Sequence, residues 1–212
     1  VFEYHKMGYT SEAMFSYLLQ LGWSSNNEDN YQFSKAVDLF TLEKINKSPS
    51  KFDIKKLNNI NSKFLNNMDI NEVYDLVCKS FNLNLENIQK NRLVAFLPEL
   101  LKRVNVYTEI RDDIEWIVNE AFICKDSDNQ KILNANLTLL KEISLLLNSC
   151  SWTKDNINST LKNYIINKNL KFKEIGYPLR LALTGKINSP DLASVIYELG
   201  CTIVTNRLNY QY

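Results

Sequence analysis

The chain contains 212 residues with a formal net charge of +1, of which 45% are hydrophobic and 23% are charged. These values are ordinary for a folded globular protein and argue against a disordered chain. Glycine and proline are scarce, at five and four residues. Because apolar residues recur at intervals of three and four, which favours helices over strands, we expect an all-α protein.

The first third of the chain is expected to form one compact helical unit. Thr10 or Ser11, Ser34 and Asp53 are candidate N-caps, and Gly22 is expected to end the first helix. Helices are predicted over residues 10–21, 34–40 and 53–65, separated by a polar loop at 24–30 and by Pro49.

The rest of the chain is also expected to be helical. Asn66-Asn67 marks the first boundary, Pro98 is a candidate helix break, and residues 125–130 predict a connection because they are rich in Asp, Ser and Asn. Helices are predicted over residues 70–80, 85–103, 107–124, a long stretch through Leu147, residues 155–167, and shorter segments of a basic tail.

The sequence offers no feature of a membrane or secreted protein. No apolar run approaches the roughly 20 residues that a membrane-spanning helix needs, and no secretory signal opens the chain. We therefore expect a cytoplasmic location. Because the chain begins with Val1 inside a helical pattern, we also expect it to be part of a longer protein.

Metal binding and nucleophilic catalysis are not expected. The four cysteines lie far apart, without the paired spacing of zinc sites, and are interpreted as reduced thiols. His5 is the only histidine, so a Ser/His/Asp or Cys/His site would have to use it as the base.

Charge is distributed unevenly along the chain. Basic and acidic residues number 8 and 7 in residues 1–66, 9 and 13 in residues 67–150, and 8 and 4 in residues 151–212. Six lysines also lie between residues 44 and 63, where only Glu43 and Asp53 oppose them. Each basic patch alone is typical of a solvated helix face, but two such patches favour an extended polyanion as partner.

Several short motifs follow one another in a characteristic order and spacing. They are Gly8-Tyr9, Glu12-Ala13, Tyr17-Leu18, Leu21-Gly22-Trp23-Ser24, the stretch from Phe40 to Leu57 with Asn61, Trp152-Thr153, Gly176-Tyr177-Pro178-Leu179-Arg180, Ser189-Pro190 and Leu199-Gly200. Together they resemble the C-terminal region of bacterial-type glutamyl-tRNA synthetases, which are class I aminoacyl-tRNA synthetases, over nearly the whole chain.

Residues 44–48, Lys-Ile-Asn-Lys-Ser, also resemble the ATP-binding Lys-Met-Ser-Lys-Ser loop of that class. We reject this second assignment because only 43 residues precede the pentapeptide, with no Gly-rich strand-to-helix turn for a nucleotide-binding sheet. In its surroundings the pentapeptide instead resembles the segment just beyond that loop.

The resemblance implies three domains: a stem-contact domain over residues 1–66 and two anticodon-binding helical subdomains over residues 67–126 and 127–212. It implies binding of glutamate tRNA, and it leaves glutamine tRNA open as a second substrate. ATP and Mg²⁺ would be used by a catalytic domain outside this chain, which alone would be inactive, and the parent enzyme is expected to be a monomer.

The resemblance also implies site residues. The arginine of the Pro-Leu-Arg motif and the following Ser-Pro loop correspond to Arg180, Ser189, Pro190 and Leu192, which would contact anticodon bases. A reader of the first anticodon base aligns with Arg103, with Arg111 as the alternative because residues 104–107 depart from the family pattern. Stem or backbone contacts are expected from Lys44, Lys47, Lys51, Lys55 and Lys56.

Two other functions compete with tRNA binding. One is a helical scaffold for protein interactions, and the other is a helix-turn-helix protein that binds DNA, although the sequence shows no compact basic recognition helix. Each proposed base reader also has a purely structural interpretation. Arg180 would pair with Glu174 or cap a helix, and Ser189-Pro190 would be an ordinary helix entry.

Overall fold

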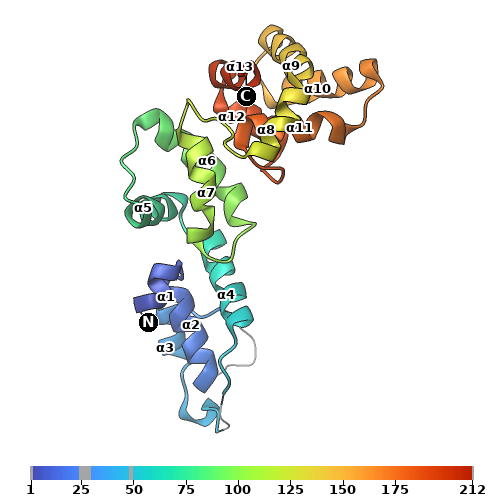
Figure 1. The fold of residues 1–212 in the computed structure, drawn as a ribbon. Helices are drawn as coiled ribbons and strands as arrows, with labels where there is room; N and C mark the ends of the chain where they lie inside the picture. The colour runs from blue at the N-terminus through green and yellow to red at the C-terminus, as the bar shows by residue number, and fades with distance from the viewer. Residues whose placement is uncertain (1, 24–29, 48–49, 212) are drawn as a thin grey trace. The chain divides into compact units, whose positions relative to one another are not determined.

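The computed structural model describes residues 2–23, 30–47 and 50–211 (Figure 1). These residues form helices joined by short connections, and their only β-type pairing is an isolated antiparallel bridge between Trp23 and Ile45. No helix among the described ranges combines the length and the apolar character needed to cross a bilayer. The expected all-α fold is confirmed.

The chain divides into two compact units. The first contains residues 1–84 and 96–111, and the second contains residues 85–95 and 112–212. Of the three predicted domains, residues 1–66 fall wholly in the first unit and residues 127–212 wholly in the second, while residues 67–126 are shared between the two. The three-domain division itself stays a prediction about function.

The first unit is built on the packing of α2 against α4. Thr10 caps α2 by accepting a hydrogen bond from the Ala13 amide, and Asp53 caps α4 by accepting from the amides of Lys55 and Lys56. The helices of this unit are α1 (Phe2–Met7), α2 (Ser11–Gly22), α3 (Phe33–Leu39), η1 (Leu42–Lys44), α4 (Ile54–Asn67), α5 (Ile70–Phe81), the end of α6 (Asn87–Leu101) and η2 (Tyr107–Ile110).

Asn61 is the polar centre of the first unit. Its side chain is fully buried, its Oδ1 accepts from the Thr10 amide at 2.9 Å, and its Nδ2 donates to the Asn105 carbonyl at 2.6 Å. Because a buried amide is costly unless it is bonded, these contacts fix α4 against both the start of α2 and residue 105. The apolar core around it consists of Tyr9, Ala13, Met14, Tyr17, Leu57, Ile60 and Val106.

The second unit packs its last six helices around one another. Helix α11 contacts α8, α9, α12 and α13, and α10 lies against α9 and α12. The unit contains the start of α6, then α7 (Arg111–Val118), which begins at the boundary residue, α8 (Ser127–Ala135), α9 (Leu137–Ser149), α10 (Lys154–Lys168), α11 (Phe172–Thr184), α12 (Leu192–Leu199) and α13 (Cys201–Leu208).

Several predicted helix boundaries are wrong. Ser34 lies inside α3, whose N-cap is Gln32 without a side-chain bond. Pro98 lies within α6 without ending it, because the burial of Leu97, Leu100 and Leu101 on the same helix offsets the lost backbone hydrogen bond and the clash of the proline ring. The predicted loop at residues 24–30 falls mostly outside the described residues, as does Pro49.

The predictions for the middle of the chain also needed correction. The expected helix over residues 107–124 is a 3-10 turn followed by α7, which ends at Val118. Asp126 accepts from the Asn129 amide, so a helix begins at Ser127 within the predicted connection. Asn136 interrupts the expected long helix, which is therefore α8 and α9.

Candidate nucleic-acid interface

The lysine segment, residues 44–56, is held against the end of α2 in the parts that the structure describes, residues 44–47 and 50–56. The Asn46 amide donates to the Gly22 carbonyl at 2.8 Å, beside the Trp23–Ile45 bridge, and the indole nitrogen of Trp23 donates to the Thr41 carbonyl at 3.1 Å. The backbone is thus pinned near its start. All five predicted lysines are exposed, and none pairs with a carboxylate among the described residues: Lys44, Lys47, Lys51, Lys55 and Lys56.

Lys55 and Lys56 occupy the first turn of α4. Cations are disfavoured there because the helix dipole is positive at its N-terminus, by about 0.3–1 kcal/mol for an exposed charge. Asp53 offsets part of this cost as the N-cap. The two lysines therefore do not serve the stability of α4, and their exposed ammonium groups suit a negatively charged partner.

Two half-exposed aromatic rings accompany the lysine segment: Phe52 lies within it, and Phe40 precedes it in the sequence. The Phe40 ring lies 5.7 Å from that of Trp23, and the Phe52 ring lies 5.0 Å from that of Tyr17. Each ring is anchored on a buried aromatic neighbour and is still more than 40% exposed. Aromatic faces between lysines are suited to contact with bases or riboses beside a phosphate backbone.

Arg103 and Arg111 differ in how free their guanidinium groups are. Arg103 is exposed in the turn that follows α6. The guanidinium of Arg111 lies 4.5 Å from the centre of the Phe81 ring, in a cation–π contact within the first unit. Arg111 is exposed as well, so the contact with Phe81 distinguishes the two arginines without removing either from solvent, and the choice of base reader between them stays a prediction.

Arg180 holds the loop that follows α11, which we call the 185–190 loop. Its Nη1 donates to the Ser189 carbonyl at 3.0 Å, to the Ser189 hydroxyl, and to the Pro190 carbonyl at 2.7 Å. The structure thus brings Arg180, Ser189 and Pro190 together, and their contacts with anticodon bases stay a prediction. Glu174, the partner of Arg180 in the purely structural interpretation, accepts a hydrogen bond from the Lys171 amide at 2.6 Å.

The buried and exposed residues of this loop were not distinguished by the sequence. Ser189 and Leu192 are only 5% and 2% exposed, and Pro190 is buried. The exposed tip is formed by Ile187, at 41% exposure, and Asn188. In this conformation the side chains that the loop exposes to solvent are those of the two tip residues. The motif comparison did not single out these two residues.

Gly185 turns the chain from α11 into the loop. Its φ of +68° lies in the left-handed region, and a Cβ atom at this position would lie 2.9 Å from Cζ of Phe122. The Thr184 hydroxyl accepts from the Lys186 amide at 3.2 Å and donates to the Arg180 carbonyl at 2.8 Å. The backbone is therefore held where the chain enters the loop at Gly185 as well as where it leaves the loop at Ser189 and Pro190.

Arg207 is buried, although it belongs to the stretch that was predicted from the sequence to form a basic tail. It is 3% exposed, and its guanidinium donates to the carbonyls of Leu183, Trp116 and Asn119. Arg92 likewise donates to the Ile117 carbonyl at 3.1 Å. These arginines satisfy the carbonyls at the end of α7, which explains why that helix stops at Val118.

Other basic residues of the tail are also engaged within the second unit. Lys154 pairs with Glu198 at 3.0 Å, and Lys168 pairs with Glu142 at 2.8 Å. Hydrogen bonds from Lys168 and Tyr164 lower the pKa of the Glu142 carboxyl. Burial, followed by the contact with Glu142, raises the pKa of Tyr164 to about 12. The tail is therefore less available to an anion than its composition predicted.

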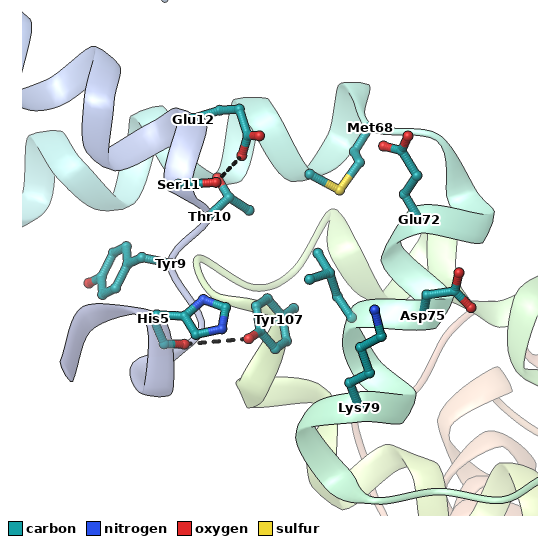
Figure 2. Close-up of a pocket in the computed structure, with 11 residues that line it drawn as sticks. His5, Tyr9, Thr10, Ser11, Glu12, Met68, Glu72, Asp75, Lys79 and Tyr107 are labelled. Carbon is teal, nitrogen blue, oxygen red and sulfur yellow. Dashed lines mark hydrogen bonds between the residues drawn. The ribbon is translucent and has the colours of Figure 1, made fainter. Parts of the chain in front are cut away.

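A hollow of about 400 Å³ in the first unit has the opposite character to the lysine segment. Figure 2 shows Glu12 of α2 and Glu72 and Asp75 of α5 around it, with His5 and Lys79. The surplus of carboxylates disfavours phosphate here. No group of three or more His, Cys, Asp or Glu residues within the described ranges is arranged to hold a metal ion.

Comparison with known proteins decides the family. The model of the family described as "Anticodon binding domain" matches residues 54–212, which is most of the chain. The chain belongs to the anticodon binding domain family. Its matched part includes α4 through α13, and with them Arg103, Arg180 and the 185–190 loop.

Curated relatives with this domain are named as glutamate–tRNA ligases. The chain is 34% identical to glutamate–tRNA ligase 1 of Bartonella henselae, 31% identical to glutamate–tRNA ligase 2 of Wolbachia pipientis subsp. Culex pipiens, and 32% identical to glutamate–tRNA ligase 1 of Hyphomonas neptunium. In each comparison 98% of the chain is matched, and it spans 44–46% of the relative, corresponding to its C-terminal part.

Solved structures share the fold of this anticodon binding domain protein. A glutamate tRNA ligase from Elizabethkingia meningosepticum superposes with a TM-score of 0.81 at 20% identity, and a glutamate-tRNA synthetase from Elizabethkingia anophelis with 0.77 at 20%. Both matches cover 97% of the chain and 41% of the solved protein.

Proposed function

We propose that this chain is the tRNA-binding and anticodon-recognition region of a glutamate–tRNA ligase, which joins glutamate to its tRNA at the expense of ATP. The observation that carries the proposal is the match of 98% of the chain to enzymes of that name, at up to 34% identity. Glutamate activation, with its ATP and Mg²⁺, would belong to the part of those enzymes that the chain does not match.

Two regions would contact the tRNA in different ways. The lysine segment would bind the phosphate backbone, since its ammonium groups are exposed and its sequence lies in the predicted stem-contact domain, residues 1–66. The predicted anticodon-binding subdomains, residues 67–126 and 127–212, would read unstacked bases. Arg103 would act in the first of these and Arg180 with the 185–190 loop in the second.

Ser189, Pro190 and Leu192 would act mainly by shaping this loop, because their side chains are buried. Base contacts would come from the loop's exposed backbone and from the tip residues Ile187 and Asn188. A side-chain amide can pair with a base edge, and an aliphatic side chain can cover a base face. Arg180 would then contribute through the loop it holds as well as through any direct contact.

A mobility-shift assay tests the proposal. The chain is titrated with glutamate tRNA, with the same tRNA carrying a changed anticodon, and with a non-cognate tRNA, over a series of salt concentrations. We expect a preference for the glutamate anticodon and an affinity that falls steeply with salt. Binding that ignores the anticodon would support the alternative of a protein-interaction scaffold, and displacement by duplex DNA would support a DNA-binding function.

The range of tRNA substrates is a further part of the proposal. An exposed Arg103 favours an enzyme that discriminates glutamate tRNA from glutamine tRNA. Charging assays of both tRNAs by the complete enzyme test this, and equal charging would contradict it. We also propose a monomeric, cytoplasmic enzyme, which sedimentation and cell fractionation would check.

A further inference from the structure

Lys186 connects the 185–190 loop to α7. Its Nζ lies 2.9 Å from Oδ1 of Asp113, and the two side chains are 33% and 16% exposed. Most ion pairs of the second unit are more exposed than this one; Lys131 and Asp128, for example, are 77% and 82% exposed. The Lys186–Asp113 pair is therefore less screened by solvent than an ordinary surface pair.

Asp113 is itself fixed in place. Its Oδ1 also accepts a hydrogen bond from the indole nitrogen of Trp116 at 2.9 Å, and the Trp116 side chain is fully buried. Asp113 lies in the first turn of α7, where the helix dipole favours a negative charge. The carboxylate is thus a rigid point on α7, whereas Lys186 immediately precedes the exposed tip Ile187-Asn188.

We infer that Asp113 is a positioning residue for anticodon recognition, which holds the tip of the 185–190 loop in its reading position through Lys186. The inference rests on the proposed function and deepens it. Arg180 holds the exit of the loop at Ser189 and Pro190, and the Asp113–Lys186 pair holds its entry, so the two tip residues are restrained from both sides. A loop restrained in this way pays less ordering entropy when it binds a base.

A competing explanation is that Lys186 simply binds a tRNA phosphate. The two explanations make different predictions for Asp113. If Lys186 binds phosphate, removing the Asp113 charge would leave binding intact or strengthen it, since the lysine is released. If Asp113 positions the loop, the same change would impair discrimination between anticodons.

The test measures the dissociation constants of the 212-residue chain for glutamate tRNA and for its anticodon-changed counterpart. The variants are Asp113→Asn, Lys186→Met, and both together, with Lys131→Met as the matched control for loss of an exposed paired lysine. The anticodon preference is the constant for the changed tRNA divided by that for glutamate tRNA. We expect each single variant to lower this preference about tenfold, the double variant to lower it no further, and the control to leave it unchanged.

Two additional measurements separate positioning from other causes. The salt dependence for Asp113→Asn should match that of the original chain, because no phosphate contact is lost. Lys186→Arg, which keeps a cation opposite Asp113, should retain most of the preference, and its loss in this variant would contradict positioning by the ion pair. Urea denaturation establishes that each variant is folded, and Asp113→Asn keeps an oxygen that can accept from the Trp116 indole.

The inference is overturned if Asp113→Asn keeps the full anticodon preference, or if the two single effects add in the double variant. It is also overturned if Lys186→Met weakens binding of both tRNAs equally and reduces the salt slope by about one. These outcomes leave the proposed function standing. An original chain without anticodon preference would instead overturn the proposed function, and the inference with it.

Discussion

In the lysine segment, five ammonium groups are exposed, while the segment is held to α2 by hydrogen bonds from Asn46, Ser50 and Asp53. In the 185–190 loop, by contrast, one arginine reaches two successive residues, and a lysine pairs with a carboxylate on another helix. A phosphate backbone can be bound by charges of imprecise position, because the attraction is long-ranged and not directional. Reading a base edge requires donors and acceptors at fixed positions, which the bonds to the 185–190 loop provide, whereas the ammonium groups of the lysine segment need only be exposed to an anion.

The largest expected effect follows from replacing Arg207, whose guanidinium bonds the end of α11 just before the loop. Arg207→Met removes the partner of the Leu183, Trp116 and Asn119 carbonyls, and each buried group left unsatisfied costs about 1–3 kcal/mol. We expect the free energy of unfolding to fall by more than about 3 kcal/mol, measured by urea denaturation. Arg103→Met is the control and should change it by less than about 0.5 kcal/mol. Similar small losses in both variants would show that the buried guanidinium is not needed.

A smaller effect is expected on binding when the loop is released. Arg180→Ala should cost about 1–3 kcal/mol of binding to glutamate tRNA and relax the anticodon preference. Arg180→Lys keeps the charge but lacks the planar guanidinium, so it should lose most of the preference while retaining the salt-dependent part of the affinity. Titrations with cognate and anticodon-changed tRNA measure both quantities. Equal losses on the two tRNAs would contradict a role for Arg180 in reading the anticodon.

A substitution in the lysine segment should lower the affinity for tRNA without changing the anticodon preference. Lys47→Ala should weaken the binding of both tRNAs by the same factor, and should reduce the slope of log K against log salt by about one. Lys131→Ala, which removes a lysine paired with Asp128, is the control and should leave that slope unchanged. A change in anticodon preference on replacing Lys47 would remove the distinction between the two regions.

The smallest expected effect concerns the pH dependence of the stability of the second unit. Because Lys168 and Tyr164 lower the pKa of the Glu142 carboxyl, its stabilising contribution is present above the ordinary value of 4.5 and is lost as pH falls below it. Glu142→Gln should therefore reduce the denaturation midpoint slightly at pH 7, and the difference from the original chain should shrink toward pH 3. A difference that persists unchanged at low pH would show that the carboxylate charge is not involved.

Features that depend on neighbouring residues were predicted well from the sequence. The capping of α2 by Thr10 and of α4 by Asp53 requires only residues within the first turn of each helix. The end of α7 was missed because its carbonyls are bonded by Arg92 and Arg207, which lie 25 and 91 residues away from their acceptors. No local pattern announces such a contact.

The candidate site shows the same limit. The motif containing Arg180 and Ser189-Pro190 named residues that the structure brings together, and their role in reading the anticodon stays a prediction. Composition could not reveal that Ser189 and Leu192 are buried while Ile187 and Asn188 form the exposed tip. Burial depends on how the loop folds against α11 and α7, and the spacing of residues in the motif does not specify it.

Because two lysines lie in the first turn of α4, dissolved salt should have opposing effects on the folding of this protein and on its binding to tRNA. In the free chain, Lys55 and Lys56 oppose the dipole of their own helix, so dissolved ions that screen them should favour the folded state. In the proposed complex the same ions compete for the phosphates and weaken association. Ionic strength would therefore act in opposite directions on folding and on binding, and tRNA itself would take over the neutralising role that salt plays in its absence.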